Sequence, residues 1–363
     1  MTHRRAGPHP TDAPGRRSRS MFLSFALWLA LRCTIAGVCA TACANASARC
    51  ADGRKMIGVN LAGAEFNAEK LPGAAFTDYV YPDAAEMQYF RTLGVNVFRL
   101  PILWERLQPG LFGELDTGEM HRIQEVAMIA RKQNACLIID VHNYGEYRGK
   151  PLGTSEVPGE AFIDLWKRVL AGFPDSEHVA FGLMNEPSKL RIADWADISQ
   201  RTVNALRKEN SRHLILVAGG RWSGAHDWNE AQGGISNADA FRSFRDAASN
   251  VAIEVHQYAD RDFSGTGTNC VDREQLQSIM ANVTQWAEKN RQRLFLGEFG
   301  AASERQCLRA LDTILDAVGN NAVWLGATYW AAGRWWGNYP LSIEPDGQGD
   351  KPQADIIKKH ITH

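Results

Sequence analysis

Residues 294–331 contain a strand–helix–strand unit. They begin with the apolar run LFLGEFG (294–300), continue through a helical stretch (303–318) and end with WLGATYWA (324–331). Each run has the length of a strand and is nearly continuous in apolar residues, which is typical of a parallel strand covered on both faces. The unit therefore indicates an α/β fold.

The same alternation extends back to Met56. Six earlier apolar runs are IGVNL (57–61), VNVFRLP (95–101), CLIIDVHNY (136–144), VAFGLMNEP (179–187), LILVAG (214–219) and VAIEVHQY (251–258). Helical stretches between the runs are Asp83–Leu93, Gly118–Asn134, Gly159–Phe173, Trp195–Asn210 and Asp272–Asn290. Eight strand–helix units predict a closed (β/α)₈ TIM barrel rather than an open, doubly wound sheet.

Composition limits the partners of the chain. Its 363 residues suit one large barrel domain, and 40 Lys+Arg against 41 Asp+Glu leave a formal charge of -1. Nothing in this balance favours nucleic acid or an anionic membrane, whereas a neutral polymer is acceptable. Eleven tryptophans are many for this length. We expect a monomer that needs no cofactor and no metal.

The first 48 residues are expected to form a signal peptide with a basic N-terminal extension. Several arginines precede the apolar run MFLSFALWLAL (21–31), and small residues with an A-x-A ending follow it. Arg32 leaves the run too short for a membrane anchor. Cleavage after Ala46 or Ala48 would release residues 49–363 as a single catalytic domain into an oxidising, secretory compartment, and Met21 is an alternative start.

Residues able to bind or react stand at the ends of the apolar runs. Six runs end in such residues: Arg99, His142, Asn185–Glu186, His256–Tyr258, Glu298 and Trp330. Because the C-terminal ends of barrel strands meet at one mouth, we expect these side chains to form one site.

Glu186 and Glu298 are the candidate acid/base and nucleophile. In a barrel, the ends of the fourth and seventh strands can bring two carboxyl groups to about 5–5.5 Å, the separation for double displacement with retention. That chemistry needs one carboxyl protonated and the other ionised. The alternative is a pair of buried structural salt bridges, with Arg99 as one partner. Burial of an ionised carboxylate at an apolar strand end costs free energy, which favours a functional role for these residues over a purely structural one.

Neighbouring residues have expected supporting roles. Arg99 would keep Glu298 ionised through a charge-assisted hydrogen bond, and Tyr258 would donate to the same carboxylate. Asn185 would bind a sugar 2-hydroxyl. For His142 and His256 two interpretations stay open, as members of the site or as hydrogen-bonded core residues.

These motifs, in this order, closely resemble glycoside hydrolase family 5. They are F-R-L-P (98–101), D-V-H-N-Y (140–144), N-E-P (185–187), V-H-Q-Y (255–258), G-E-F-G (297–300) and Y-W (329–330). The resemblance implies Glu186 as acid/base and Glu298 as nucleophile. It also implies a supporting shell of Arg99, His142, Asn185, His256, Tyr258 and Trp330.

Further stretches resemble the secreted endo-β-1,4-glucanases of that family. They are H-Q-Y-A-D-R-D-F-S-G-T (256–266), G-R-W-S-G-A-H-D-W (220–228) and W-A-A-G-R-W-W-G-N-Y (330–339). The implied partner is a β-glucan polysaccharide or cello-oligosaccharide. Tryptophans in these stretches are candidate platforms for pyranose rings, with core packing as the alternative for each. The candidates are Trp222, Trp228, Trp330, Trp335 and Trp336; weaker ones are Trp104 and Tyr144, with Asn143 as a hydroxyl contact.

Three other functions stay open at this point. The substrate could be another β-glycan, such as mannan, xyloglucan or mixed-linkage glucan. A non-catalytic carbohydrate-binding barrel would require that Glu186 or Glu298 be replaced, and both are present. A metallohydrolase barrel would need His and Asp clusters on several strand ends.

Four cysteines follow the expected signal peptide. Cys270 lies after the sixth strand and Cys307 opens the helix after the seventh, so neighbouring units and the family resemblance both predict a disulfide between them. Two buried free thiols are the alternative. Cys136 lies within a strand and is expected to be a buried free thiol. Cys50 is expected to be unpaired.

Overall fold

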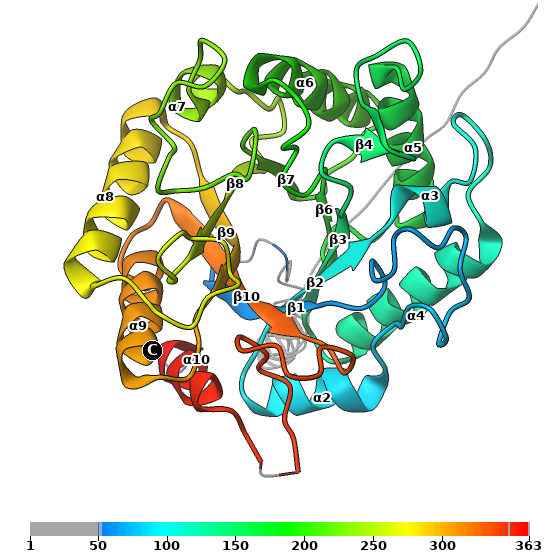
Figure 1. The fold of residues 1–363 in the computed structure, drawn as a ribbon. Coiled ribbons are helices and arrows are strands. Elements are labelled where there is room, and N and C mark those ends of the chain that lie inside the picture. The colour runs from blue at the N-terminus through cyan, green and yellow to red at the C-terminus, as the bar shows by residue number, and fades with distance from the viewer. Residues whose placement is uncertain (1–49, 51–52, 348, 362–363) are drawn as a thin grey trace, which may run out of the picture. The chain divides into compact units, whose positions relative to one another are not determined.

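Eight parallel strands close into a barrel, as the sequence predicts. We describe Cys50 and residues 53–347 and 349–361 of a computed structural model (Figure 1). The strands are β1 (Met56–Leu61), β2 (Val97–Ile102), β3 (Cys136–Val141), β6 (Val179–Gly182), β7 (Ile215–Ala218), β8 (Val251–Tyr258), β9 (Leu294–Gly300) and β10 (Trp324–Ala332). They are hydrogen-bonded in the order β1-β10-β9-β8-β7-β6-β3-β2, so the fold prediction is confirmed.

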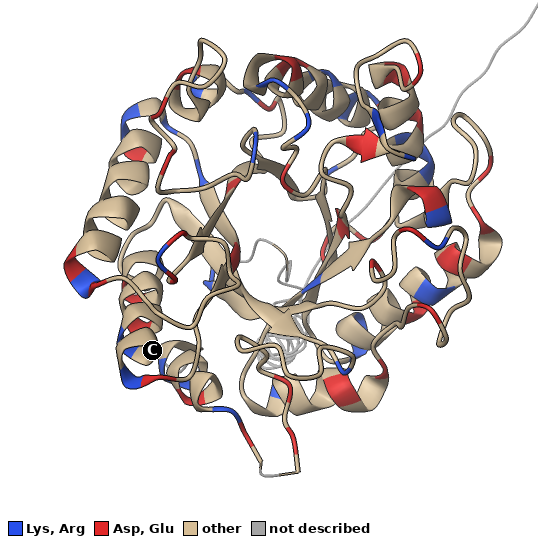
Figure 2. Cartoon of the chain, viewed as in Figure 1, with Lys and Arg blue, Asp and Glu red and all other residues tan. Residues whose placement is uncertain are grey.

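Helices surround the barrel (Figure 1). They are α2 (Ala84–Thr92), α3 (Trp104–Leu107), α4 (Thr117–Lys132), α5 (Gly159–Gly172), α6 (Ile192–Lys208), α7 (Asn237–Phe241), α8 (Arg273–Asn290), α9 (Arg305–Gly319) and α10 (Pro352–Ile361). Aspartates start several of them, because Asp83, Asp116 and Asp272 accept hydrogen bonds from backbone N–H groups of the first turn. Lysines, arginines and acidic residues are interspersed over the outer helices (Figure 2).

The core has two parts that follow from strand geometry. Successive side chains of a strand point to opposite faces, so one set packs outward against the helices. The other set fills the barrel, where Met56, Val97, Ile138, Leu216 and Phe295 belong to one buried cluster near the strand beginnings. This filling leaves the C-terminal mouth as the open end.

Some elements were not predicted from the sequence. α3, α7 and α10 are additional, and β4 (Glu146–Tyr147) pairs with β5 (Lys150–Pro151) in a small hairpin outside the barrel. α6 begins three residues before the predicted Trp195. The predicted signal segment, residues 1–48, lies outside the described residues. Within the described part of the chain, no helix is long and apolar enough to cross a membrane.

The four cysteines in the described part of the chain form two disulfides. The predicted Cys270–Cys307 bond is confirmed, with 5.2 Å between the Cα atoms. The prediction that Cys136 and Cys50 are unpaired is wrong, because they are bonded to each other. The Cys50 N–H donates to the Glu177 carbonyl at 2.8 Å, just before β6 begins. This contact places Cys50 beneath the barrel, next to the start of the neighbouring strand β3.

Removal of either disulfide is expected to lower the free energy of unfolding. The bonds join residues 37 and 86 positions apart, so the chain-entropy model gives a loss of about 4 kcal/mol for either one. Urea denaturation of the variant pairs Cys270→Ala/Cys307→Ala and Cys50→Ala/Cys136→Ala measures this effect. An unfolding free energy equal to that of the wild type would contradict the pairing concerned.

Candidate active site

Glu186 and Glu298 face each other at the C-terminal mouth. Glu186 follows β6, the fourth barrel strand, and Glu298 lies in β9, the seventh. One carboxylate oxygen of each residue lies within 4.8 Å of the other. This separation is close to that of retaining glycosidases, and too short for the water that inverting enzymes place between their carboxyl groups.

Glu298 is held as a carboxylate. Its Oε1 accepts from Arg99 Nη1 at 3.1 Å, and its Oε2 accepts from the Tyr258 hydroxyl at 2.6 Å. Burial raises the pKa of Glu298, but His256 and Arg99 lower it more, so the net pKa lies below its ordinary value. An ionised carboxylate is the form that can attack a sugar carbon.

The pKa of Glu186 is shifted in the opposite direction. Burial raises its pKa above the ordinary value, and the nearby charge of Glu298 acts in the same direction. Its Oε1 lies 2.8 Å from His256 Nδ1. Its backbone is left-handed, with φ 36°, a conformation rare for residues other than glycine and concentrated at functional sites. Glu186 therefore suits the role of proton donor.

Asn185 is fixed by two neighbours. Its Oδ1 accepts from Arg99 Nη2 at 2.8 Å, and its Nδ2 lies 3.2 Å from His142 Nε2. His142 Nδ1 in turn lies 2.8 Å from Asp140 Oδ2. Arg99, Asn185 and Asp140 are all almost completely buried, so the amide is held in one orientation beside the two glutamates.

An open cleft extends on both sides of the glutamates. Its Trp330 half, about 760 Å³, is lined by Trp330, Trp336 and His142, among others. Its Trp222 half, about 610 Å³, includes Glu186 and Trp222, and Tyr144 lines both halves. The Trp330 ring stacks on His142 with 5.3 Å between ring centroids.

The structure separates the aromatic candidates. Trp222 is 51% exposed in the cleft, whereas Trp228 and Trp104 are 0% exposed and belong to the core. The platform predictions for Trp228 and Trp104 are therefore wrong: Trp228 packs against Trp286, and Trp104 against Tyr147. Trp335 is exposed, but it does not line either half of the cleft.

Asn143 lines the Trp330 half, but its amide is engaged within the protein. Its Oδ1 accepts from the Trp104 N–H at 2.8 Å, and its Nδ2 donates to Glu105 Oε2 at 2.6 Å. These bonds fix the loop after β3 against α3. Its role as a substrate contact remains a prediction.

Two buried acids and a half-buried one near the site were not singled out from the sequence. Asp140 and Glu254 each contact a site histidine and Arg99. Each stands two residues before its histidine, on the same strand face, and this spacing is the signal that could have found them. Glu65 lines the Trp330 half, and burial raises its pKa to about 7.

Among the residues that the structure describes, two groups of side chains are close enough to hold a metal ion. One consists of Glu186, His256 and Glu298. The other consists of Asp312 and Asp316 in α9 and His360 in α10. A metal-binding histidine must offer an unprotonated nitrogen. Both ring nitrogens of His256 face carboxylates, which favour the protonated ring. The first group is therefore better suited to proton transfer.

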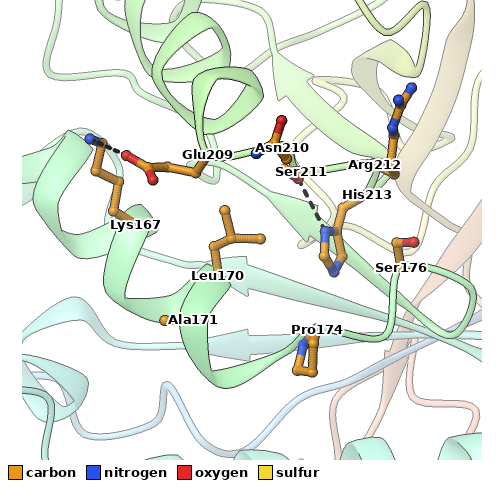
Figure 3. Close-up of a pocket in the computed structure, with 10 residues that line it drawn as sticks. All are labelled: Lys167, Leu170, Ala171, Pro174, Ser176, Glu209, Asn210, Ser211, Arg212 and His213. Atoms are coloured by element: carbon orange, nitrogen blue, oxygen red, sulfur yellow. Dashed lines mark hydrogen bonds and ion pairs between the residues drawn. The ribbon is translucent and has the colours of Figure 1, made fainter.

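A separate hollow of about 520 Å³ lies toward the N-terminal ends of β6 and β7 (Figure 3). Lys167 and Glu209 form an ion pair at its edge, and Ser211 Oγ lies 3.1 Å from His213 Nδ1. It contains none of the strand-end residues described above. Conserved chemistry in such barrels occurs at the opposite face, so this hollow is not the candidate active site.

Comparison with known proteins decides the family. The sequence model described as cellulase (glycosyl hydrolase family 5) matches residues 59–334. The chain belongs to glycosyl hydrolase family 5. It is therefore a glycoside hydrolase, and the family resemblance read from the strand-end motifs is confirmed.

Relatives within family 5 are similar over most of their length. Endo-beta-1,4-glucanase B of Emericella nidulans is 34% identical over 81% of this chain and 87% of its own. An endo-beta-1,4-glucanase from Xanthomonas axonopodis pv. citri is 43% identical, with a TM-score of 0.83 over 85% of this chain and 98% of its own. The structure of XacCel5A in complex with cellopentaose is 45% identical, with a TM-score of 0.82 over 85% and 99%.

Proposed function

We propose that this family 5 hydrolase is a secreted, retaining endo-β-1,4-glucanase. The observation that carries the retaining mechanism is the pair Glu186 and Glu298, with carboxylate oxygens within 4.8 Å and pKa values displaced in opposite directions. Two disulfides support export to an oxidising compartment. The signal-like segment 1–48 supports it from the sequence.

The first chemical step forms a covalent intermediate. The Glu298 carboxylate attacks the anomeric carbon while Glu186 donates its proton to the departing glycosidic oxygen. The carbon–oxygen bond to the leaving sugar breaks, and an ester bond to Glu298 forms. Arg99 and Tyr258 orient the Glu298 carboxylate through the hydrogen bonds described above.

The second step hydrolyses that ester. Water occupies the place of the departed sugar, and the Glu186 carboxylate accepts a proton from it as the water attacks the same carbon. The ester bond to Glu298 breaks, and two inversions give net retention. In this mechanism Asn185 binds the sugar 2-hydroxyl, a contact that strengthens in the transition state.

The relatives and the cleft support a β-1,4-glucan as the substrate. Similar proteins are named endo-beta-1,4-glucanases, and one was solved with cellopentaose. The cleft continues on both sides of Glu186 and Glu298, which suits cleavage within a chain. Reducing-sugar release from carboxymethylcellulose, mannan and xylan, measured side by side, tests the substrate. Faster release from mannan or xylan would favour another β-glycan.

The pH profile of kcat/KM is expected to be bell-shaped. Activity needs Glu298 ionised and Glu186 protonated, so it falls at low pH as Glu298 gains a proton and at high pH as Glu186 loses one. Because the pKa of Glu298 is lowered and that of Glu186 raised, the active form spans the range between them. A value of kcat/KM that stays constant from about pH 3 to about pH 9 would contradict this assignment, because this range covers the titration of both ordinary and shifted carboxyl groups.

Trp222→Ala is expected to weaken substrate binding with little change in chemistry. Trp222 is exposed in the cleft and lies edge-on to Tyr144, with 6.2 Å between ring centroids. Loss of one stacking platform corresponds to about 1–2 kcal/mol, or roughly a tenfold rise in KM for cello-oligosaccharides at similar kcat. Trp335→Ala, an exposed tryptophan outside the cleft, is the matched control. Equal effects of the two changes would contradict the platform role.

A further inference from the structure

Two barrel strands carry the same arrangement of an acid two residues before a histidine. On β3, Asp140 Oδ2 lies 2.8 Å from His142 Nδ1. On β8, Glu254 Oε1 lies 3.1 Å from His256 Nε2. Both acids also contact the same nitrogen, Nη2 of Arg99, at 3.1 Å and 3.0 Å. The two acid–histidine pairs therefore flank a single buried guanidinium.

The outer nitrogen of His142 faces a hydrogen-bond donor. Arg99 has only N–H groups, so the oxygen of the Asn185 amide must face it, and the amide nitrogen must face His142 Nε2 at 3.2 Å. Burial lowers the pKa of His142, while Asp140, together with Glu298 and Glu65, raises it above its ordinary value. A proton on Nε2 would nevertheless put two donors face to face. This geometry favours a neutral His142 ring.

The outer nitrogen of His256 faces acceptors instead. Its Nδ1 lies 2.8 Å from Glu186 Oε1 and 3.6 Å from Glu298 Oε2. Its Nε2 faces Glu254, so a carboxyl group meets each nitrogen of an almost completely buried ring. Only a ring protonated on both nitrogens donates at once to Glu254 and to an unprotonated oxygen of Glu186.

We propose that Glu254 is a positioning residue that keeps His256 as an imidazolium directed at Glu186. Burial lowers the pKa of His256, but Glu298, Glu186 and Glu254 together raise it to about 10. The imidazolium stabilises the carboxylate that Glu186 becomes after it donates its proton. This effect on catalysis rests on the proposed role of Glu186 as the acid, whereas the charge of His256 can be tested independently of that role.

Gly297, in the motif G-E-F-G, fits this proposal. A Cβ atom at position 297 would lie 2.0 Å from Glu254 Oε1, which is closer than two atoms can approach. Glu254 therefore occupies the space that a side chain before the candidate nucleophile would fill. The absence of a side chain at Gly297 leaves room for the Glu254 carboxylate beside His256 and Arg99.

The charge of His256 can be measured directly in the wild-type protein. We expect ¹⁵N NMR of histidine-labelled protein, assigned with a His256→Gln spectrum, to show both His256 nitrogens protonated from pH 6 to about pH 8, since the ring pKa is raised to about 10. His142 should show one unprotonated nitrogen. A His256 ring that is neutral at pH 7 would overturn the proposal, even if Glu298→Gln abolishes activity as the proposed function requires.

Two isosteric variants separate this role from a general structural one. In Glu254→Gln, His256 should lose its proton at a pH at least about 2 units lower than in the wild type, and kcat/KM should fall about tenfold or more. The alkaline limb of the pH profile of kcat/KM should move to higher pH, because a charged His256 lowers the pKa of Glu186. Asp140→Asn, the matched pair on β3, should leave the His256 titration in place. Glu254→Asp, which keeps the carboxylate, should restore part of the wild-type titration. An unchanged His256 titration in folded Glu254→Gln would overturn the proposal.

Discussion

Glu298→Gln is expected to abolish hydrolysis while the protein stays folded and still binds cello-oligosaccharides. The change keeps the shape of the side chain but removes the charge that attacks the anomeric carbon. Loss of a nucleophile removes covalent catalysis, so kcat should fall on the order of 10⁴-fold or more. Turnover of carboxymethylcellulose and calorimetric binding of cellotetraose measure the two properties separately.

Glu69→Gln is the matched control for that variant. Glu69 is an exposed glutamate that lines the same cleft, in the Trp330 half. Its kcat should remain within about twofold of the wild type, as is usual for a surface substitution. Glu298→Gln with activity within tenfold of the wild type would exclude Glu298 as the nucleophile.

Glu186→Ala is expected to reduce activity on polymer by about 10²–10⁴-fold, the usual contribution of a general acid. Dinitrophenyl glycosides have a leaving group that needs little protonation, so formation of the ester on Glu298 should be much less affected. Hydrolysis of the ester then becomes slow, because Glu186 also activates water. Azide, which needs no base, should restore turnover and give a β-glycosyl azide.

The comparison of substrates decides that second assignment. Equal losses on carboxymethylcellulose and on the dinitrophenyl glycoside would count against Glu186 as the acid. An α-configured azide product would count against a covalent intermediate on the opposite face. Glu105→Gln is a useful control, because Glu105 is buried near the same mouth but binds Asn143 and the Arg148 N–H.

The fold could be predicted because barrel strands have a strong local signal. Each strand is covered on both faces, so its sequence is a continuous apolar run, and all eight runs became strands. The candidate site could be predicted for a related reason. A polar residue such as Glu298 at the end of such a run is easily seen against its apolar neighbours, and parallel strands bring those ends together.

Features that depend on long-range packing could not be predicted. Trp222 and Trp228 belong to one stretch of sequence, yet Trp228 is buried because it packs against Phe241 of α7 and Trp286 of α8. Cys50 pairs with Cys136 because Cys50 is held at the Glu177 carbonyl, beside the start of β3, a contact between distant parts of the sequence. In the sequence, Glu254 is only an isolated acid within an apolar run. The structure shows that Arg99 and His256 lie beside it.

The central claim is that the enzyme forms a covalent glycosyl ester on Glu298. Dinitrophenyl 2-deoxy-2-fluoro-β-cellobioside should trap this ester, because fluorine slows both steps while the good leaving group preserves the first. Mass spectrometry of the inactivated protein should show one added fluorocellobiosyl group, and peptide mapping should place it on Glu298. Label on another residue, or an unlabelled protein that hydrolyses cello-oligosaccharides with inversion, would contradict the account.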